Sequence, residues 1–259
     1  MKQRLEQLLE RLEPISLEEL EERAALLKRV DHKYVVDERV LRSLLERLTA
    51  EHEVLEIDGR RMFGYESNYF DTPGLRCFLD HVADRVPRFK ARTRYYRDSG
   101  ECVFEVKLKL ADDETDKRQT EHPADQRDDL TPDAERCLSD ALADASIELD
   151  EPLQRALVTA FDRATVAARD ASGRVTIDLD VALSLPRGDE RRLLPDLVVV
   201  ETKSEDGDSP ADRVLAELGV EPVSFSKYRV GTGLLTGREH EPASAFFDPT
   251  RARPPSPSA

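Results

Sequence analysis

The sequence predicts an α+β domain built mainly from antiparallel β-sheet, and we expect that sheet to close into a β-barrel. Apolar residues recur at helical spacing early in the chain, as in Leu5, Leu8, Leu9 and Leu12. From Glu53 onward the apolar period changes to two, the period of half-buried strands. Charges inside otherwise apolar strands need water or a partner, and a closed barrel gives every strand one side that faces a lumen.

Three helices are expected in the first third of the chain. The leucine repeat marks the first. Ser16 followed by Glu19 forms a capping box that begins a second helix running toward Lys28. Asp37 caps a third helix, which has an apolar face of leucines. Between the second and third helices lies RVDHKYVV, a short strand-like run that contains Lys33.

Six further strands are expected after the helices, bounded by turn residues. They are Val54–Ile57, Tyr65–Phe70, Arg88–Tyr96, Cys102–Lys109, Arg174–Leu185 and Leu197–Lys203. The turn Asp98-Ser99-Gly100 joins the third and fourth of these strands as a hairpin.

The second half of the chain also carries helix signals. Thr131 and Ser209 are each followed by a proline, the pattern of an N-cap before the first helical residue. Another helix is expected over Leu153–Phe161, and the acidic segment Asp112–Asp129 is interpreted as a long loop. We expect residues 1–238 to form one domain, followed by a disordered tail over residues 239–259, which ends in a Pro- and Ser-rich run.

Composition excludes several classes of protein. The formal net charge of −15 argues against nonspecific nucleic-acid binding and against docking on anionic membranes. No apolar run is long enough for membrane insertion and the first residues are charged throughout, so we expect a cytoplasmic protein. The three cysteines, Cys77, Cys102 and Cys137, are far apart and are interpreted as reduced thiols rather than disulfides or zinc ligands.

The sharpest chemical signal is the run RFKARTRYY. Its four basic residues occupy alternate positions, so a strand places all of them on one face: Arg88, Lys90, Arg92 and Arg94. After the turn, FEVKLK puts Glu105, Lys107 and Lys109 on one face as well. Like charges on neighbouring strands destabilise a sheet unless water or a bound polyanion compensates them. From these two strands by themselves, water and a bound polyanion are equally possible as the compensation.

Later strands favour the polyanion. Glu201 and Lys203 share a face directly after three valines, and Lys227 lies beside two aromatic residues. Arg offers forked donors that match phosphate oxygens, while Glu or Asp can hold Mg²⁺ or Mn²⁺. Alternatives remain at single positions. Glu201 and Lys203 also fit a surface ion pair, and Asp178 also fits a polar lumen without metal.

Other residues carry weaker signals. His32 and His81 are single histidines, interpreted as ordinary surface or supporting residues. Arg163 is expected to be exposed by default, at a helix-to-strand junction. The sequence contains no Gly-rich phosphate loop, nucleophile elbow or HExxH pair, which excludes a P-loop kinase and a triad hydrolase.

Several motifs together resemble the VTC domain, the polyphosphate polymerase domain of the vacuolar transporter chaperone complex, in its stand-alone bacterial form. They occur in the family's order between Arg29 and Leu235: RVDHKYVV, YESNYFDTPGL, RFKARTRYYRDSGECVFEVKLK with TDKRQ downstream, DRATVAARDASGRVTIDLD, VVVETKS and SFSKYRVG. The resemblance implies a triphosphate tunnel, an antiparallel barrel with helices packed outside. It also implies transfer of the terminal phosphoryl group of ATP to polyphosphate, with Mn²⁺ or Mg²⁺ as cofactor.

The resemblance also implies roles for individual residues. The residues that match the family's catalytic Lys and Arg side chains are Lys33, Arg92, Arg94, Lys107, Arg163 and Lys227. Substrate binding is implied for Lys117 or Arg118 and for Arg174, and metal binding for Glu201. The alternation of basic residues along the two strands, rather than the resemblance, adds Arg88, Lys90 and Lys109 to the expected substrate-binding residues. Two alternative functions stay open: a tripolyphosphate or nucleoside-triphosphate hydrolase on the same fold, and a non-catalytic polyphosphate-binding module.

Overall fold

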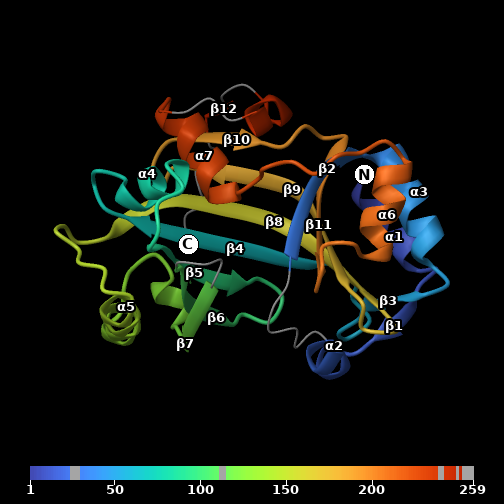
Figure 1. Cartoon of the computed structure of the whole chain (residues 1–259), viewed down its shortest axis with the longest axis horizontal. Coiled ribbons are helices and arrows are strands. Elements are labelled where there is room, and N and C mark those ends of the chain that lie inside the picture. The colour runs from blue at the N-terminus through green and yellow to red at the C-terminus, as the bar shows by residue number, and fades with distance from the viewer. Residues whose placement is uncertain (24–29, 111–114, 239–241, 249–250, 253–259) are drawn as a thin grey trace.

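A computed structural model describes the chain except for residues 24–29, 111–114, 239–241, 249–250 and 253–259. Its central feature is a sheet that curls around a helix near the C-terminus, with further helices on its outer side (Figure 1). The strands are β1 (Glu13–Ile15), β2 (Val30–Asp37), β3 (His52–Leu55), β4 (Phe63–Asp71), β5 (Arg88–Tyr96), β6 (Cys102–Lys109), β7 (Thr115–Glu121), β8 (Gln154–Ala168), β9 (Arg174–Ser184), β10 (Asp189–Arg192), β11 (Leu197–Ser204) and β12 (Arg251–Ala252).

The helices begin at residues that can cap them. Asp37 accepts a hydrogen bond from Val40 N, Thr131 from Ala134 N and Ser209 from Asp212 N. Ser16 and Glu19 form the predicted capping box, while the expected continuation of that helix to Lys28 lies outside the described residues. The helices are α1 (Lys2–Leu9), α2 (Leu17–Arg23), α3 (Glu38–Leu48), α4 (Arg76–Val82), α5 (Pro132–Asp144), α6 (Pro210–Glu217) and α7 (Lys227–Thr236), with short 3-10 turns η1 (Ala124–Gln126) and η2 (Pro242–Phe246). None of the helices in the described ranges combines the length and apolarity needed to cross a bilayer.

The predicted closed barrel is wrong, because the sheet is open. Its main path runs β7-β6-β5-β4-β8-β9-β11-β2, all antiparallel, and among the described strands β2 pairs only with β11 and β7 only with β6. Closure would require these two edge strands to pair with each other. Both carry charged side chains along their length, a feature that discourages pairing at a sheet edge.

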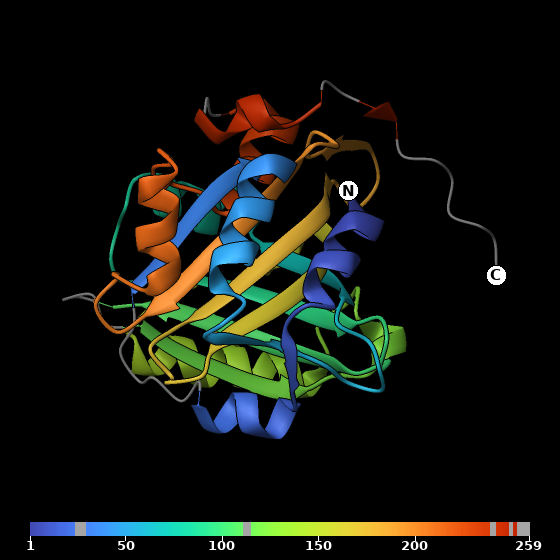
Figure 2. The same cartoon turned by 90° about the vertical axis from the view of Figure 1, so that its right-hand side faces the viewer.

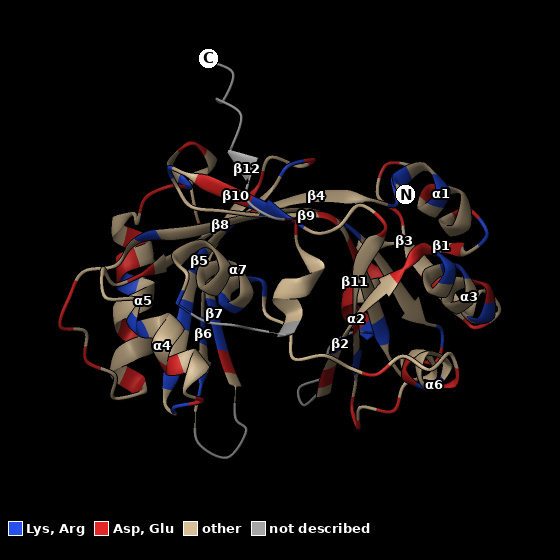
Figure 3. Cartoon of the chain, turned by 90° about the horizontal axis from the view of Figure 1, so that it is seen from above, with Lys and Arg blue, Asp and Glu red and all other residues tan. Residues whose placement is uncertain are grey.

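Two apolar layers cover the outer side of the sheet. Helices α1, α3 and α6 pack across β2, β11, β9 and β8 through residues such as Leu44 and Ile177 (Figure 2). Helix α5 packs on β6 and β7 in an apolar cluster that includes Phe104, whereas α4 packs against β4, β5 and α7, and its His81 contacts Lys90. Seen from above, the sheet therefore forms two limbs, each backed by its own helices (Figure 3).

Helix α7 lies on the inner side of the sheet instead. It contacts β8, β9 and β10, and its other side contacts α4. Gly231 permits this close approach, since a Cβ there would come within 2.9 Å of the Leu157 side chain and 3.3 Å of Leu183. The helix thus fills one end of the space between the limbs and presents its N-terminus, at Ser226 and Lys227, to the inner face.

Two predicted elements are corrected. The helix expected over Leu153–Phe161 is the first half of strand β8, where Val158 and Thr159 pair with both β4 and β9. Tertiary pairing overrides the local helical signal there. The expected loop Asp112–Asp129 contains edge strand β7, whose residues are all charged or polar, so the strand lacks an apolar period.

Candidate functional site

One face of the curled sheet collects most of the basic residues singled out in the sequence. Alternation along each strand and the antiparallel register place these side chains on the same inner side. We call this set the cationic face: Lys33 of β2, Arg88, Lys90, Arg92 and Arg94 of β5, Lys107 and Lys109 of β6, Lys117 of β7, Arg163 of β8, Arg174 of β9, Lys203 of β11 and Lys227 of α7. Figure 3 shows basic residues along β5, β6 and β7.

Glu105 binds three of these cations at the centre of β6. Its carboxylate is 3% exposed and accepts from Arg92 Nε at 2.7 Å, while Lys117 Nζ lies 2.7 Å away and Arg94 Nη1 3.8 Å away. Burial alone would raise the pKa of Glu105, but the charges of Arg92, Arg94 and Lys117 outweigh it and hold the pKa well below its usual range. Glu105 of β6 therefore stays ionised and fixes cations of the two strands beside it, β5 and β7.

Asp178 of β9 holds two other cations of this face in the same way. Arg163 donates two hydrogen bonds to it, from Nε at 2.6 Å and from Nη2 at 2.9 Å, and Lys227 also donates to it. Asp178 is 1% exposed; burial opposes its charge, yet Arg163 and Lys227 keep its pKa below the usual value. Arg163 is thus an inward-facing residue rather than the exposed one expected from sequence.

Aromatic rings support the same cations. Lys227 Nζ lies 4.4 Å from the centroid of the Phe161 ring, and the Arg163 guanidinium lies 5.1 Å from it. Arg92 donates to the hydroxyl of Tyr69 at 2.9 Å and also lies over its ring. These contacts hold the basic side chains in fixed positions before any ligand binds.

Glu201 lies among lysines. Its carboxylate is 2.7 Å from Lys203 Nζ and 3.3 Å from Lys33 Nζ, and Lys203 also donates to Asp31 at 3.0 Å. Burial opposes the charge of Glu201, but Lys203, Lys33 and Arg163 lower its pKa well below the usual range. Two carboxylates, Glu201 and Asp31, therefore converge on one ammonium group.

Glu201 and Asp31 would offer a divalent ion two carboxylates at most. Within the described residues there is no group of three or more His, Cys, Asp or Glu side chains able to hold a metal ion. Mg²⁺ commonly takes only one or two carboxylates and fills its remaining positions with water and substrate phosphate oxygens. Glu201 and Asp31 supply that number, and the position between them now holds the Lys203 ammonium.

Lys90 and Lys107 differ from the other cations of this face. They stand directly opposite each other in the register of β5 and β6, and within the described part of the chain neither forms an ion pair with a carboxylate. Burial and then the charges of Lys107, Arg92 and Lys33 lower the pKa of Lys90, and burial lowers the pKa of Lys107. This part of the face brings two like charges together, which water around the exposed Lys107, the nearby Asp31 and Glu201, or a bound anion can compensate.

The remaining predicted residues lie toward the margins of the face. Arg88 pairs with the exposed Asp84 at 2.9 Å. Arg118 projects to the outer side of β7, opposite Val106, and pairs with Asp116 and Asp144 of α5. The structure thus separates Lys117, which is on the cationic face, from Arg118, which is not.

Some residues of the site were not predicted. Asp31 lies two positions before Lys33, so strand alternation alone could have placed it on the same face. Glu105 was placed on the face without a role, and its contacts depend on β7, which was not expected. His81 and Ser226 approach Lys90 from α4 and α7, and no sequence period indicates that contact.

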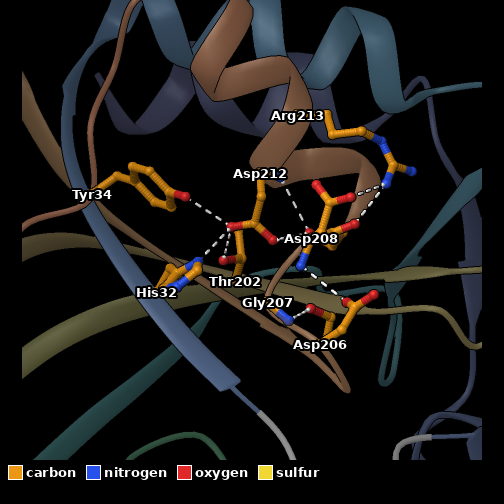
Figure 4. A network of polar contacts seen from close by, with 10 residues as sticks. His32, Tyr34, Thr202, Asp206, Gly207, Asp208, Asp212 and Arg213 are labelled. Carbon is orange, nitrogen blue, oxygen red and sulfur yellow. Dashed lines mark hydrogen bonds and ion pairs between the residues drawn. The ribbon is translucent and has the colours of Figure 1, made fainter.

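The outer side of β2 and β11 is fixed by a separate polar network around Asp212 of α6 (Figure 4). The Asp212 carboxylate accepts from Tyr34 Oη at 2.8 Å and Thr202 Oγ1 at 2.5 Å, and His32 Nδ1 lies 3.4 Å away. These residues alternate along the strands with Lys33 and Glu201. The network therefore holds the strands that carry the carboxylate and lysines of the inner face.

Comparison with known proteins identifies a family. The family model described as "VTC domain" matches residues 28–236. No curated protein matches the chain. Among solved structures, it is similar to a proposed adenylyl cyclase from Hippeastrum with a dominant triphosphatase activity, at 15% identity and a TM-score of 0.48, covering 82% of this chain and 97% of that one.

Two further solved structures show a comparable likeness. One is a proposed adenylate cyclase from Vibrio parahaemolyticus, at 14% identity and a TM-score of 0.44, covering 77% of this chain and 94% of that one. The other is a protein from Pyrococcus horikoshii, at 16% identity and a TM-score of 0.45, covering 81% and 99%. Likeness this distant carries no conclusion about the reaction.

Proposed function

We propose that this chain, which belongs to the VTC domain family, transfers the terminal phosphoryl group of ATP to polyphosphate. The polyphosphate chain would bind along the cationic face. The observation that carries the proposal is the pair of lysines, Lys90 and Lys107, which lie directly opposite each other and form no ion pair within the described residues. A phosphate between them would replace like-charge repulsion by two charge-assisted hydrogen bonds. A neutral ligand would leave the repulsion in place.

The surrounding residues suit a chain of phosphates rather than a single one. Arg92, Arg94 and Arg163 present forked donors that match pairs of phosphate oxygens. They are held in place by Glu105 and Asp178, so their donors are already oriented when the ligand arrives. The cations occupy both limbs of the sheet, which gives an extended polyanion contacts along its length.

Phosphoryl transfer requires chiefly positioning and neutralisation of charge, which fixed cations provide. Lys227 at the N-terminus of α7 and Arg163 would bind oxygens of the group being transferred, while Lys90 and Lys107 would hold the acceptor chain. Glu201 and Asp31 would hold the divalent ion, which would supply positive charge to neutralise the phosphate groups. No covalent intermediate on the protein is needed.

The test is to incubate the purified protein with ATP and Mn²⁺ and to separate the products on a gel that resolves polyphosphate. Long chains that disappear on treatment with a polyphosphatase support the proposed function. Phosphate release without chains would assign the protein to the hydrolases instead. Binding of long chains without consumption of ATP would make it a binding module, and either of these outcomes overturns the polymerase.

A further inference from the structure

His81, in the last turn of α4, makes a direct contact with the least compensated part of the cationic face. Its Nε2 atom lies 3.0 Å from Lys90 Nζ. When Lys90 is protonated its ammonium group can only donate, so Nε2 is then the acceptor and the imidazole proton is on Nδ1. The contact therefore fixes the tautomer of His81 as well as the position of Lys90.

His81 stays neutral under ordinary conditions. Burial, followed by the charges of Lys90, Arg88 and Arg229, with a smaller effect from Lys107, lowers its pKa to about 2. All of the charged groups that act on it are cations, which repel a second positive charge. His81 is thus an acceptor for Lys90 throughout the pH range in which the protein would be assayed.

The other ring nitrogen of His81, Nδ1, lowers the stability of the fold. Nδ1 is buried and has no hydrogen-bond partner within the described residues. An unsatisfied buried donor is uncommon and destabilising, so a histidine that served packing alone would be a poor choice at this position. The cost is understandable if the acceptor at Nε2 serves the site.

The elements that hold His81 are rigidly connected. Asp71, fully buried, accepts from Cys77 N and Phe78 N of α4 and from the Tyr228 hydroxyl of α7. It therefore ties the helix of His81 to the helix whose N-cap, Ser226, lies 3.4 Å from Lys90 Nζ. Lys90 is held from two directions by groups that share one buried anchor.

We propose that His81 is a positioning residue for phosphate binding: together with Ser226, it holds the Lys90 ammonium opposite Lys107 and so keeps a two-lysine site ready for one phosphate of the chain. The inference rests on the proposed function of the cationic face. Without the acceptor, Lys90 would withdraw from Lys107, because their charges repel each other. His81 acts through Lys90 and needs no contact with the ligand.

The experiment compares three variants by titration with inorganic tripolyphosphate in the absence of metal. His81→Leu removes the acceptor and should weaken binding about tenfold, as expected for loss of a hydrogen bond to a charged group. His81→Gln can still accept from Lys90 and should bind as the wild type does. In a Lys90→Met background, His81→Leu should cause no further loss, since its effect passes through Lys90.

The outcomes separate this inference from the function on which it rests. Normal binding by His81→Leu, or a loss in His81→Gln as large as in His81→Leu, overturns the positioning role alone. A further loss in the Lys90→Met background also overturns it. Failure of the wild type to bind tripolyphosphate overturns the proposed function and the inference with it. Should His81→Leu not fold, His81→Phe repeats the comparison with a ring that lacks the acceptor.

Discussion

Arg92 donates to the buried carboxylate of Glu105 at 2.7 Å, directly across the β5–β6 hairpin. Lys117 approaches the same carboxylate from β7, on the other side of β6. One anion therefore joins three strands that would otherwise repel each other. The cationic face thus contains an internal counter-charge, and its basic residues differ in whether they depend on that charge.

Replacement of Arg92 and of Lys107 should change stability in opposite directions. Arg92→Ala leaves Glu105 buried with Arg94 and Lys117 only, and should lower the free energy of unfolding by about 1–3 kcal/mol. Lys107→Met removes a charge that faces Lys90 and should leave the melting temperature unchanged or higher. Thermal unfolding of both variants without ligand measures these changes in stability. Equal destabilisation by the two changes would show that Lys107 is compensated after all.

Acid should destabilise the protein partly through Glu105. Its pKa in the folded state is depressed below the usual value of about 4.3. A depressed folded-state pKa contributes stability that is complete above the unfolded-state value and is lost as the pH falls toward the folded-state value.

The free energy of unfolding of the wild type should therefore fall more steeply below about pH 5 than that of Glu105→Gln. Urea unfolding at a series of pH values provides the comparison. Glu121→Gln, an exposed change on β7, is the control and should follow the wild type. Parallel curves for the wild type and Glu105→Gln would mean that Glu105 is not held ionised.

Two adjacent basic residues of β7 should differ in function. Lys117 lies on the cationic face and Arg118 on the outer side, paired with Asp144. Lys117→Met should weaken tripolyphosphate binding several-fold, whereas Arg118→Met, with the same change of charge, should not. Titrations at about 0.05 M and about 0.2 M salt separate local contacts from the general effect of net charge. A loss in Arg118→Met as large as in Lys117→Met would place the ligand elsewhere.

The β5–β6 hairpin was predictable because its signals are local. Strict alternation and the turn at Asp98-Ser99-Gly100 determine which residues face the same way, and the pairing of Lys90 with Lys107 follows from the turn. Openness of the sheet was not predictable in this manner. It depends on whether β2 and β7 meet after the curvature of all the intervening strands has accumulated.

For the site as well, contacts that depend on local sequence were predictable and contacts that depend on tertiary packing were not. Alternation brings together basic residues from several strands, because it requires only that each strand be recognised. The missed contacts come from elements that are placed by tertiary packing rather than by local sequence. They are the contacts of His81 in α4 and Ser226 in α7 with Lys90, and the contact of Lys117 in the unexpected strand β7 with Glu105. The helix predicted over Leu153–Phe161 failed for a related reason, since pairing on both sides decides the structure of β8.

Glu201→Gln should separate binding from turnover. The cationic face would still bind phosphate, so affinity for tripolyphosphate without metal should be retained or increased. Turnover of ATP with Mn²⁺ should fall by about 10²–10³, the usual cost of losing one such electrostatic contact. ATP consumption and thermal stability are measured on the same preparation.

The alternative is a purely structural role for Glu201 through Lys33 and Lys203. That role predicts a less stable protein with near-normal turnover. A variant that is destabilised but still active would eliminate Glu201 as a metal ligand.

The most direct test of a phosphate chain on the cationic face is the metal-free affinity of Lys107→Met for tripolyphosphate. Lys107 makes no ion pair within the described residues, so its replacement removes no ion pair from that part of the folded protein. We predict at least about tenfold weaker binding, as for loss of a charge-assisted hydrogen bond, with no loss of thermal stability. Wild-type affinity in this variant would contradict the account.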